Sequence, residues 1–410
     1  MKIGLFGQFG SGNLGNDGSL EAMLQLLRRV RPDADLLCIC PRPDVVSRRF
    51  GIATAQLGGR PFSSGIIRAV DKVFLKLPHR LSGFIGAVTV AHGLDLVIVP
   101  GTGILDDFGE GPFGWPLVVL CWALATRLGG AKLAFVSIGA GPVANGMSRR
   151  FIRMAGLIAA FRSYRDTISQ DFMKSLGVDS RADPVSADLA FALPPAEDEP
   201  RNHAQGCVGI GVMTYRGWKK RDARGPAIYE AYLGKLAEIA ETLLRQGQQV
   251  RLLIGDLGDR EAIDNLLNRI HAPGAEKIVV EPAASLEDVM RQIATTDIVV
   301  ASRYHNIVCA LAMGRPAISL GYAAKNGALL SDTGLDGFQH HIETFDPKAV
   351  LAQIDTMLER REQLAADVRE GVKRYRLQLA HQEEILRAGL LREPRDAALS
   401  PSLRHREVPR

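Results

Sequence analysis

The segment 302–326, SRYHNIVCALAMGRPAISLGYAAKN, places Arg303, Tyr304, His305 and Lys325 among small and apolar neighbours, directly after an apolar run. Arginine and lysine bind carboxylates and phosphates. Histidine is the side chain whose ordinary pKa lies closest to neutrality. Any one of these residues has a structural alternative, since a single histidine is often a core residue. Together, at the end of a predicted strand and the start of a helix, they predict an anion site with a proton donor.

Two other arginines occupy positions where an anion could be held. Arg165 and Asp166 stand just before a predicted helix in SYRDTISQ, and Arg216 follows a predicted strand in VMTYRGW. A guanidinium can bind carboxylate or phosphate through two parallel hydrogen bonds. Lone arginines are common on protein surfaces, so a structural explanation remains open for each. The position at the end of a strand favours a binding role for Arg216.

Three glycine-rich segments also follow predicted strands: GQFGSGNLGNDGS, VPGTGILDD and VSIGAGP. Glycine lets the backbone approach a ligand closely, and free N–H groups at the start of a helix favour anions. The first segment lacks the spacing of a dinucleotide fingerprint, and Asp17 is equally explained as a helix cap. The candidate ligand-binding residues in these segments are Gly12, Asn13, Gly15, Asn16, Asp17, Gly101, Gly103, Asp106 and Gly139.

Strand and helix patterns alternate along the first half of the chain. We predict strands at 2–6, 34–40, 94–100, 131–139 and 167–170, a helix after the first glycine-rich segment, and helices at 116–128 and 147–161. Continuously apolar strands that alternate with helices are typical of a parallel sheet covered on both faces. The first half is therefore predicted to be an αβα domain.

The same pattern restarts after a segment rich in proline and charge. We predict strands at 207–213, 249–255, 277–282, 297–302 and 316–322, and helices at 227–246, 259–270, 285–294 and 306–313. Two Rossmann-like αβα domains of this kind would face each other across a cleft, at the carboxyl ends of their strands. The predicted organisation is an N-terminal domain at 1–195, a linker at 196–205, a C-terminal domain at 206–345, helices at 346–392 and a disordered tail at 393–410.

The composition narrows the class of protein. The 410 residues are 46% hydrophobic and 23% charged, with a net charge of +5, as is typical of soluble globular proteins. No apolar run reaches the roughly 20 residues of a membrane span, and the N-terminus lacks the apolar segment of a signal peptide. We therefore expect a cytoplasmic protein.

Neither a metal nor a nucleic-acid partner is expected. The five cysteines lack metal-ligand spacing and are expected to pack in the core. No nucleic-acid module is present in the sequence.

The segment 59–84, GRPFSSGIIRAVDKVFLKLPHRLSGF, mixes lysines and arginines with large apolar residues. Such a segment could lie on an anionic bilayer at the inner face of the cell membrane, in peripheral association. It could equally be a solvated helix packed on the first domain. Both interpretations remain open at this stage, and so does the oligomeric state.

Several motifs together resemble the polysaccharide pyruvyl transferases. They are GSGNLGNDGSL, GTGILDD, VSIGAGP, YRDTIS with SLGV, SADLAFAL and, most specifically, SRYHNIVCALAMGRPAISLGYAAKN. The resemblance runs from about residue 2 to about residue 325. It implies a two-domain fold like that of GT-B glycosyltransferases, with the acceptor on the side of the N-terminal domain (1–195) and the donor on the side of the C-terminal domain (206–345). It also implies that phosphoenolpyruvate is the donor substrate for a pyruvate ketal on a cell-surface polysaccharide or its lipid-linked precursor, without a cofactor.

The resemblance maps the family's arginine-x-histidine pair onto Arg303 and His305, its later lysine onto Lys325, and its arginine-aspartate pair onto Arg165 and Asp166. Ketal formation also suits these residue types. The methylene carbon of the enol must be protonated, for which an acid with a pKa near neutrality is suitable. Cations near the phosphate stabilise its departure.

Two other functions remain as alternatives. The first is a GT-B glycosyltransferase that uses a nucleotide sugar. Many of these enzymes hold the ribose with a glutamate in a motif that corresponds here to CALAMGRP, where Cys309 stands in the place of the glutamate. The second is a non-catalytic sugar-binding protein, which would need no proton donor. Turnover of phosphoenolpyruvate to phosphate would separate all three functions.

Overall fold

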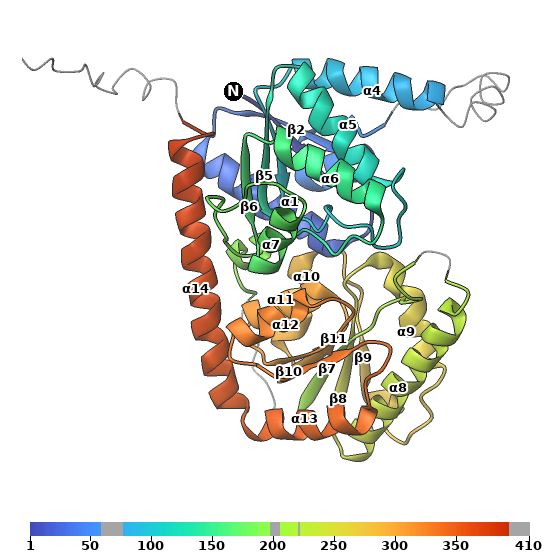
Figure 1. Cartoon of the computed structure of the whole chain (residues 1–410). Helices are drawn as coiled ribbons and strands as arrows, with labels where there is room; N and C mark the ends of the chain where they lie inside the picture. Colours follow the sequence, from blue (N-terminus) through green and yellow to red (C-terminus); the bar gives the residue numbers. More distant parts are fainter. Residues whose placement is uncertain (59–76, 197–205, 220–221, 393–410) are drawn as a thin grey trace, which may run out of the picture.

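The computed structural model describes residues 1–58, 77–196, 206–219 and 222–392. Its N-terminal domain is built on a six-stranded parallel sheet of order β3-β2-β1-β4-β5-β6 (Figure 1). The strands are β1 (Lys2–Phe6), β2 (Asp35–Cys40), β3 (Ala53–Gln56), β4 (Leu96–Pro100), β5 (Lys132–Ile138) and β6 (Phe161–Tyr164). The linker predicted at 196–205, apart from residue 196, and the tail predicted at 393–410 lie outside the described residues.

Helices cover both faces of this sheet. They are α1 (Leu14–Val30), α2 (Pro43–Phe50), α4 (Leu77–His92), α5 (Trp115–Leu128), α6 (Gly146–Ile158) and α7 (Thr167–Ser175). Alternate strand residues point to opposite faces. In β1, Ile3 and Leu5 join a core with α1, whereas Phe6 joins a second core with α4, α5 and α6. The sheet is therefore buried on both sides, which explains its continuously apolar strands.

The C-terminal domain repeats the plan with the order β12-β11-β10-β7-β8-β9. Its strands are β7 (Cys207–Gly211), β8 (Gln249–Leu253), β9 (Ile278–Val280), β10 (Ile298–Ala301), β11 (Ala317–Gly321) and β12 (Gln339–His341). Its helices are α8 (Gly225–Arg245), α9 (Arg260–Leu267), α10 (Leu286–Ala294), α11 (Tyr304–Ala312), α12 (Lys325–Asp332) and α13 (Pro347–Glu359). The prediction of two parallel αβα domains is confirmed, and both sheets present the carboxyl ends of their strands to a common cleft.

The strand predicted at 167–170 is wrong. These residues open α7, because the Asp166 side chain accepts a hydrogen bond from the Ser169 N–H and caps the helix. The sixth strand, β6, lies just before it. The prediction also missed the edge strands β3 and β12, which are short and only partly buried. Edge strands carry a weaker apolar pattern, so periodicity alone does not reveal them.

The last helix, α14 (Arg361–Ala388), runs alongside both domains (Figure 1). It contacts α11 of the C-terminal domain and the short 3₁₀ helix Leu189–Ala192 beside α1. The Ser186 hydroxyl donates to the backbone carbonyl of Gln378, and Arg376 donates to that of Phe191. The prediction that the C-terminal helical segment packs across the domains is confirmed. Among the described residues, no helix is both long and apolar enough to cross a bilayer.

Helix α14 also contacts an irregular part of β5. Ser137 has a φ of 52°, a conformation that costs a residue with a Cβ on the order of 1 kcal/mol or more. Its N–H donates to Ser163 Oγ at 2.8 Å, and its Oγ accepts from Gln382 Nε2 at 2.9 Å. The pairing of β5 with β6 shifts register here. Gly139, two residues later, lies against the guanidinium of Arg165, which lines the cavity. These side-chain bonds therefore support the backbone behind a cavity residue.

We predict that Gln382→Leu lowers the free energy of unfolding by about 1–3 kcal/mol, because it removes the partner of a buried hydroxyl. Urea denaturation would measure the change. Gln378→Leu, on the exposed side of the same helix, should change stability by no more than about 0.5 kcal/mol. Equal effects of the two substitutions would contradict a stabilising role for the Ser137–Gln382 contact.

Candidate functional site

A cavity of about 190 Å³ lies between the two domains, where the carboxyl ends of the two sheets meet. The N-terminal domain contributes Gln8, Asn13, Asn16, Thr102, Gly103, Ile104, Asp106, Phe108, Glu110, Trp115 and Arg165. The C-terminal domain contributes Gly255, Arg303, Tyr304, His305, Tyr322 and Lys325. The structure thus brings together all the residues of 302–326 that the sequence singled out, with Arg165 opposite them.

Arg303 precedes the first turn of α11 at the end of β10. Its guanidinium donates two hydrogen bonds to Asp259, at 2.7 and 2.8 Å. Asp259 is fully buried and also accepts from the Thr214 N–H. Burial lowers the pKa of Arg303, but the ion pair and hydrogen bonds with Asp259, together with the nearby Asp256 and Tyr322, raise it, so the net direction is upward. Arg303 is therefore a fixed cation, held in place by a buried carboxylate.

Arg165 follows β6 and is almost completely buried. It donates to Asp188 at 3.1 Å and lies 3.5 Å from Asp166. Its guanidinium stacks on the Tyr304 ring, 4.2 Å from the centroid. A Cβ on Gly139 would lie 2.6 Å from this guanidinium, so only glycine allows the approach. Arg165 is thereby shared between the domains, since Tyr304 belongs to the C-terminal one.

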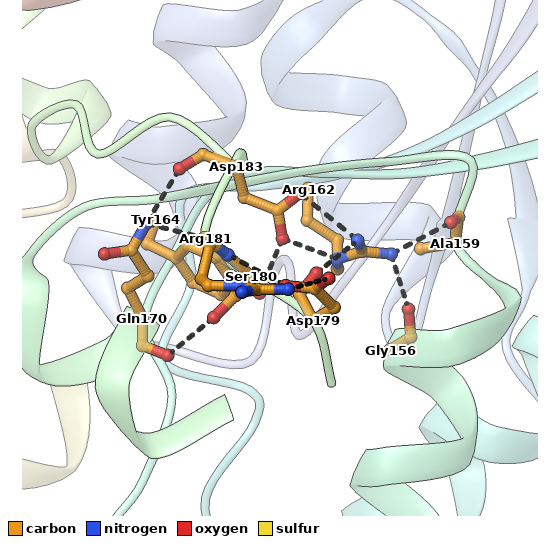
Figure 2. Close-up of polar contacts among 9 residues, drawn as sticks. All are labelled: Gly156, Ala159, Arg162, Tyr164, Gln170, Asp179, Ser180, Arg181 and Asp183. Atoms are coloured by element: carbon orange, nitrogen blue, oxygen red, sulfur yellow. Dashed lines mark hydrogen bonds and ion pairs between the residues drawn. The ribbon is translucent and has the colours of Figure 1, made fainter. Parts of the chain in front are cut away.

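A polar network holds β6, the strand that directly precedes Arg165 (Figure 2). Arg162 of β6 donates to both oxygens of Asp183, at 2.7 and 3.2 Å, and to the carbonyls of Gly156 and Ala159 at the end of α6. Gln170 of α7 donates to the carbonyl of Asp183 at 2.8 Å. These bonds tie α6, β6, α7 and the following loop together, so Arg165 projects from a rigid base.

Lys325 begins α12 at the end of the turn after β11. Among the described residues, no carboxylate lies within 4.0 Å of its ammonium, although both arginines have such partners. Burial lowers the pKa of Lys325, and the charge of Arg165 lowers it further. Nearby, burial raises the pKa of Asp106, and Lys325 partly opposes that shift. An ammonium with no bound counter-ion facing a cavity favours an anionic ligand.

His305, in the first turn of α11, packs against the first turn of α1. A Cβ on Gly15 would lie 2.0 Å from its Nδ1. Its Nε2 has no hydrogen-bond partner among the described residues and lies 3.7 Å from Asp188. Burial lowers the pKa of His305 to about 4, and the nearby cations act in the same direction. The imidazole of the free protein is therefore neutral at neutral pH, unlike the near-neutral pKa expected from the sequence.

The first glycine-rich loop joins the domains through its backbone. The Leu14 N–H donates to the Gly255 carbonyl at 3.1 Å, and the Leu257 N–H donates to the Gly12 carbonyl at 2.9 Å. Asn13 caps α1 by accepting from the Asn16 N–H. Gly12 has a φ of 105°, which favours glycine. This loop therefore forms part of the cavity wall and part of the domain interface.

Other predicted residues lie away from the cavity lining. Arg216 is half-exposed, stacks on Tyr229 and lies 3.5 Å from Glu261. Asp17 is buried, and its carboxylate accepts from the Gly10 N–H and from Arg49. Gly101, with a φ of 52°, accepts from the Ser19 hydroxyl. Direct ligand contact by these residues stays a prediction.

Apart from Tyr304, the sequence analysis did not select the aromatic residues of the cavity. Phe108 stacks on Tyr322 across the domain interface, with ring centroids 4.8 Å apart, and contacts Trp218 edge to face. Trp115, at the start of α5, also lines the cavity. The clearest available signal was the position of Phe108 after GTGILDD. Within the described part of the chain, no group of three or more His, Cys, Asp or Glu side chains is arranged to hold a metal ion.

Comparisons with known proteins place this site in context. A family model described as polysaccharide pyruvyl transferase matches residues 13–323. No curated protein sequence matches the chain. Anabaena HepE in complex with UDP-glucose has a similar structure, with a TM-score of 0.59 at 14% identity, covering 95% of this chain and 99% of that one. The UDP-GlcNAc 2-epimerase from Neisseria meningitidis, bound to UDP-GlcNAc, gives 0.58 at 12%, covering 96% and 100%. These similarities show a shared GT-B fold.

The low pKa of His305 predicts how stability depends on pH. The unfolded chain binds a proton to this residue near its ordinary pKa of 6.5, whereas the folded chain does so only near 4. Stability is therefore lost as pH falls through this window. Between about pH 7.5 and about pH 5, the wild-type protein should lose about 2 kcal/mol more than His305→Asn. Urea denaturation at both pH values measures this difference. An equal loss of unfolding free energy in the two proteins would contradict a buried neutral imidazole.

Proposed function

Because the chain belongs to the polysaccharide pyruvyl transferase family, we propose that it transfers a pyruvyl group from phosphoenolpyruvate to two hydroxyls of a saccharide. The products would be a pyruvate ketal and inorganic phosphate. The observation that carries this proposal is the interdomain cavity, where the ammonium of Lys325, which has no carboxylate partner among the described residues, shares the lining with the anchored cations Arg165 and Arg303.

The charges of the cavity suit a small donor with two anionic groups. Phosphoenolpyruvate carries a carboxylate and a phosphate. Lys325 has no carboxylate partner within 4.0 Å in the described chain, so it can pair with one group without breaking an existing bond. Arg165 and Arg303 keep their carboxylate partners on one side and face the cavity on the other. One ammonium without a carboxylate partner among the described residues, in the same cavity as two guanidinium groups held by aspartates, supports recognition of such a donor.

The proposed reaction uses His305 as the proton donor. Anion binding favours the charged imidazolium, so the donor itself would raise the pKa of His305 and cause proton uptake. The imidazolium then protonates the methylene carbon of the enol, and the first sugar hydroxyl attacks the neighbouring carbon. The second hydroxyl displaces phosphate, which leaves with the electron pair of the broken C–O bond. The two hydroxyl protons balance the proton given to carbon and the one carried by phosphate.

The family implies a saccharide acceptor, and we assign it to the N-terminal wall of the cavity. Gln8, Asn13 and Asn16 offer amides there, and Phe108 and Trp115 offer aromatic rings. Amides donate to and accept from sugar hydroxyls. Aromatic faces cover the apolar faces of sugar rings. This wall supports binding of a saccharide whose hydroxyls point toward His305.

A nucleotide-sugar enzyme remains the main competing proposal, since the similar structures contain UDP, UDP-glucose or UDP-GlcNAc. One position weighs against it. Cys309, which stands where many GT-B glycosyltransferases carry a ribose-binding glutamate, is fully buried on α11. A non-catalytic sugar-binding role would give the imidazole of His305 only its packing role against Gly15.

The donor can be tested by calorimetry. Phosphoenolpyruvate should bind, and Lys325→Met should weaken binding by about tenfold to hundredfold, the loss typical of a charge-assisted contact. Lys348→Met, on the exposed start of α13, is the matched control and should bind normally. Tight binding of UDP-glucose with no response to phosphoenolpyruvate would favour the nucleotide-sugar alternative.

The role of His305 can be tested with His305→Asn. Phosphate release should fall by about 10² to 10⁴ while donor affinity stays within severalfold, because the cations supply most of the attraction. Proton uptake on donor binding, measured by calorimetry in buffers of different ionisation enthalpy, should disappear. The exposed His381→Asn is the control.

His305→Asn with wild-type turnover would exclude His305 as the acid. Arg303→Ala is a poor test of the same site. It would leave the carboxylate of Asp259 buried without its partner, and such a change costs about 3–5 kcal/mol of stability. A loss of activity in that variant would not separate catalysis from folding.

A further inference from the structure

Three helices of the N-terminal domain present an unusual outer surface. Helices α4, α5 and α6 lie side by side over one face of the sheet (Figure 1). Their inner sides build a core with residues such as Trp122 and Ile152. We call their exposed side the α4–α6 face. Its exposed large or basic side chains are Arg80, Leu81, Ile85, Phe113, Arg127, Leu128, Met147, Arg149, Arg150, Arg153, Met154 and Leu157.

This face holds most of the exposed large apolar side chains of the described chain. Among the described residues, ten large apolar side chains are exposed, and seven of these ten lie on the α4–α6 face. Leu81, Ile85 and Phe113 are between 56% and 62% exposed. On α6, Met147, Met154 and Leu157 recur at helical spacing, so they project from one side. Scattered exposed apolar residues are ordinary, but this concentration marks an interaction surface.

The charge of the face has a single sign. No aspartate or glutamate occurs between Gly111 and Arg165, nor within α4. In the described part of the chain, none of the five arginines of the face lies within 4.0 Å of a carboxylate. The nearest acidic residue along the chain, Glu110, lines the cavity instead. Helix α14, in contrast to the α4–α6 face, carries a mixture of acidic and basic residues.

We propose that the α4–α6 face docks the protein on an anionic lipid bilayer. Arginines without counter-ions attract anionic headgroups, and leucine, isoleucine and methionine side chains between them can enter the interface between headgroups and acyl chains. A nucleic acid would use the arginines and leave the apolar side chains exposed. The combination of the two kinds of side chain on one face therefore favours lipid.

The α4–α6 face lies next to the cavity, so docking through this face would hold the cavity near the bilayer. Phe113 lies two residues before Trp115, which lines the cavity, and Arg80 of α4 lies over the Phe113 ring at 5.4 Å. The face thus reaches the edge of the cavity on the N-terminal side. The predicted membrane segment 59–84 enters α4 at its end, but its residues 59–76 lie outside the described chain, and the proposal stands on α4, α5 and α6. It also does not depend on the proposed reaction, since docking needs no substrate.

Vesicle co-sedimentation of the full chain tests the proposal. The protein should sediment with phosphatidylcholine vesicles that contain about a third phosphatidylglycerol, and should stay in solution with phosphatidylcholine alone or in high salt. Arg150→Glu combined with Arg153→Glu should weaken partitioning by about 25-fold or more. Met154→Ser combined with Leu157→Ser should weaken it without a change in charge.

The matched control is Arg245→Glu combined with Lys373→Glu, which makes the same change in net charge on α8 and α14 and should leave vesicle binding nearly unchanged. All these side chains are exposed, so thermal melting should be the same for every variant. The proposal is overturned if the wild-type protein ignores anionic vesicles, if the control loses binding as strongly as the α6 variant, or if an oligonucleotide duplex is bound in preference to the vesicles.

Discussion

The contact between His305 and Gly15 is the constraint on which the site depends. The imidazole lies where a Cβ of residue 15 would be, so the two domains can approach only because that residue is glycine. Close by, main-chain hydrogen bonds join Gly12 and Leu14 to the loop after β8. The same approach buries the imidazole, lowers its pKa to about 4 and encloses the cavity. Domain contact and site electrostatics therefore have one cause.

The three cations of the site differ in whether they have a carboxylate partner. Arg165 and Arg303 each have a buried aspartate, which fixes their position and charge. Lys325 has no such partner within the described residues, so its ammonium is the group that a ligand can neutralise. Buried charges are costly unless paired. In the proposed function, the two paired cations keep their positions through their aspartates, and the cation without a partner among the described residues attracts the anionic donor.

Support for this geometry extends far from the cavity. The network around Arg162 and Asp183 holds the strand that carries Arg165 (Figure 2). On the adjacent strand, Gln382 of α14 bonds Ser137, two residues before the glycine that allows Arg165 to approach. Since α14 contacts both domains, this helix, which follows the C-terminal sheet in the sequence, helps to position residues on the N-terminal side of the site.

The sequence by itself determined the two parallel αβα domains, because continuously apolar strands alternating with helices have few other solutions. It also predicted that Arg165, Arg303, His305 and Lys325 lie together, because they follow strands whose carboxyl ends face one cleft, and all four line the same cavity. Their roles in binding and catalysis stay predictions. The tertiary structure alone decided which cations are paired, that Arg216 stacks on Tyr229 outside the cavity, and that His305 is neutral. These properties depend on distances and burial between segments far apart in the chain, which no local pattern records.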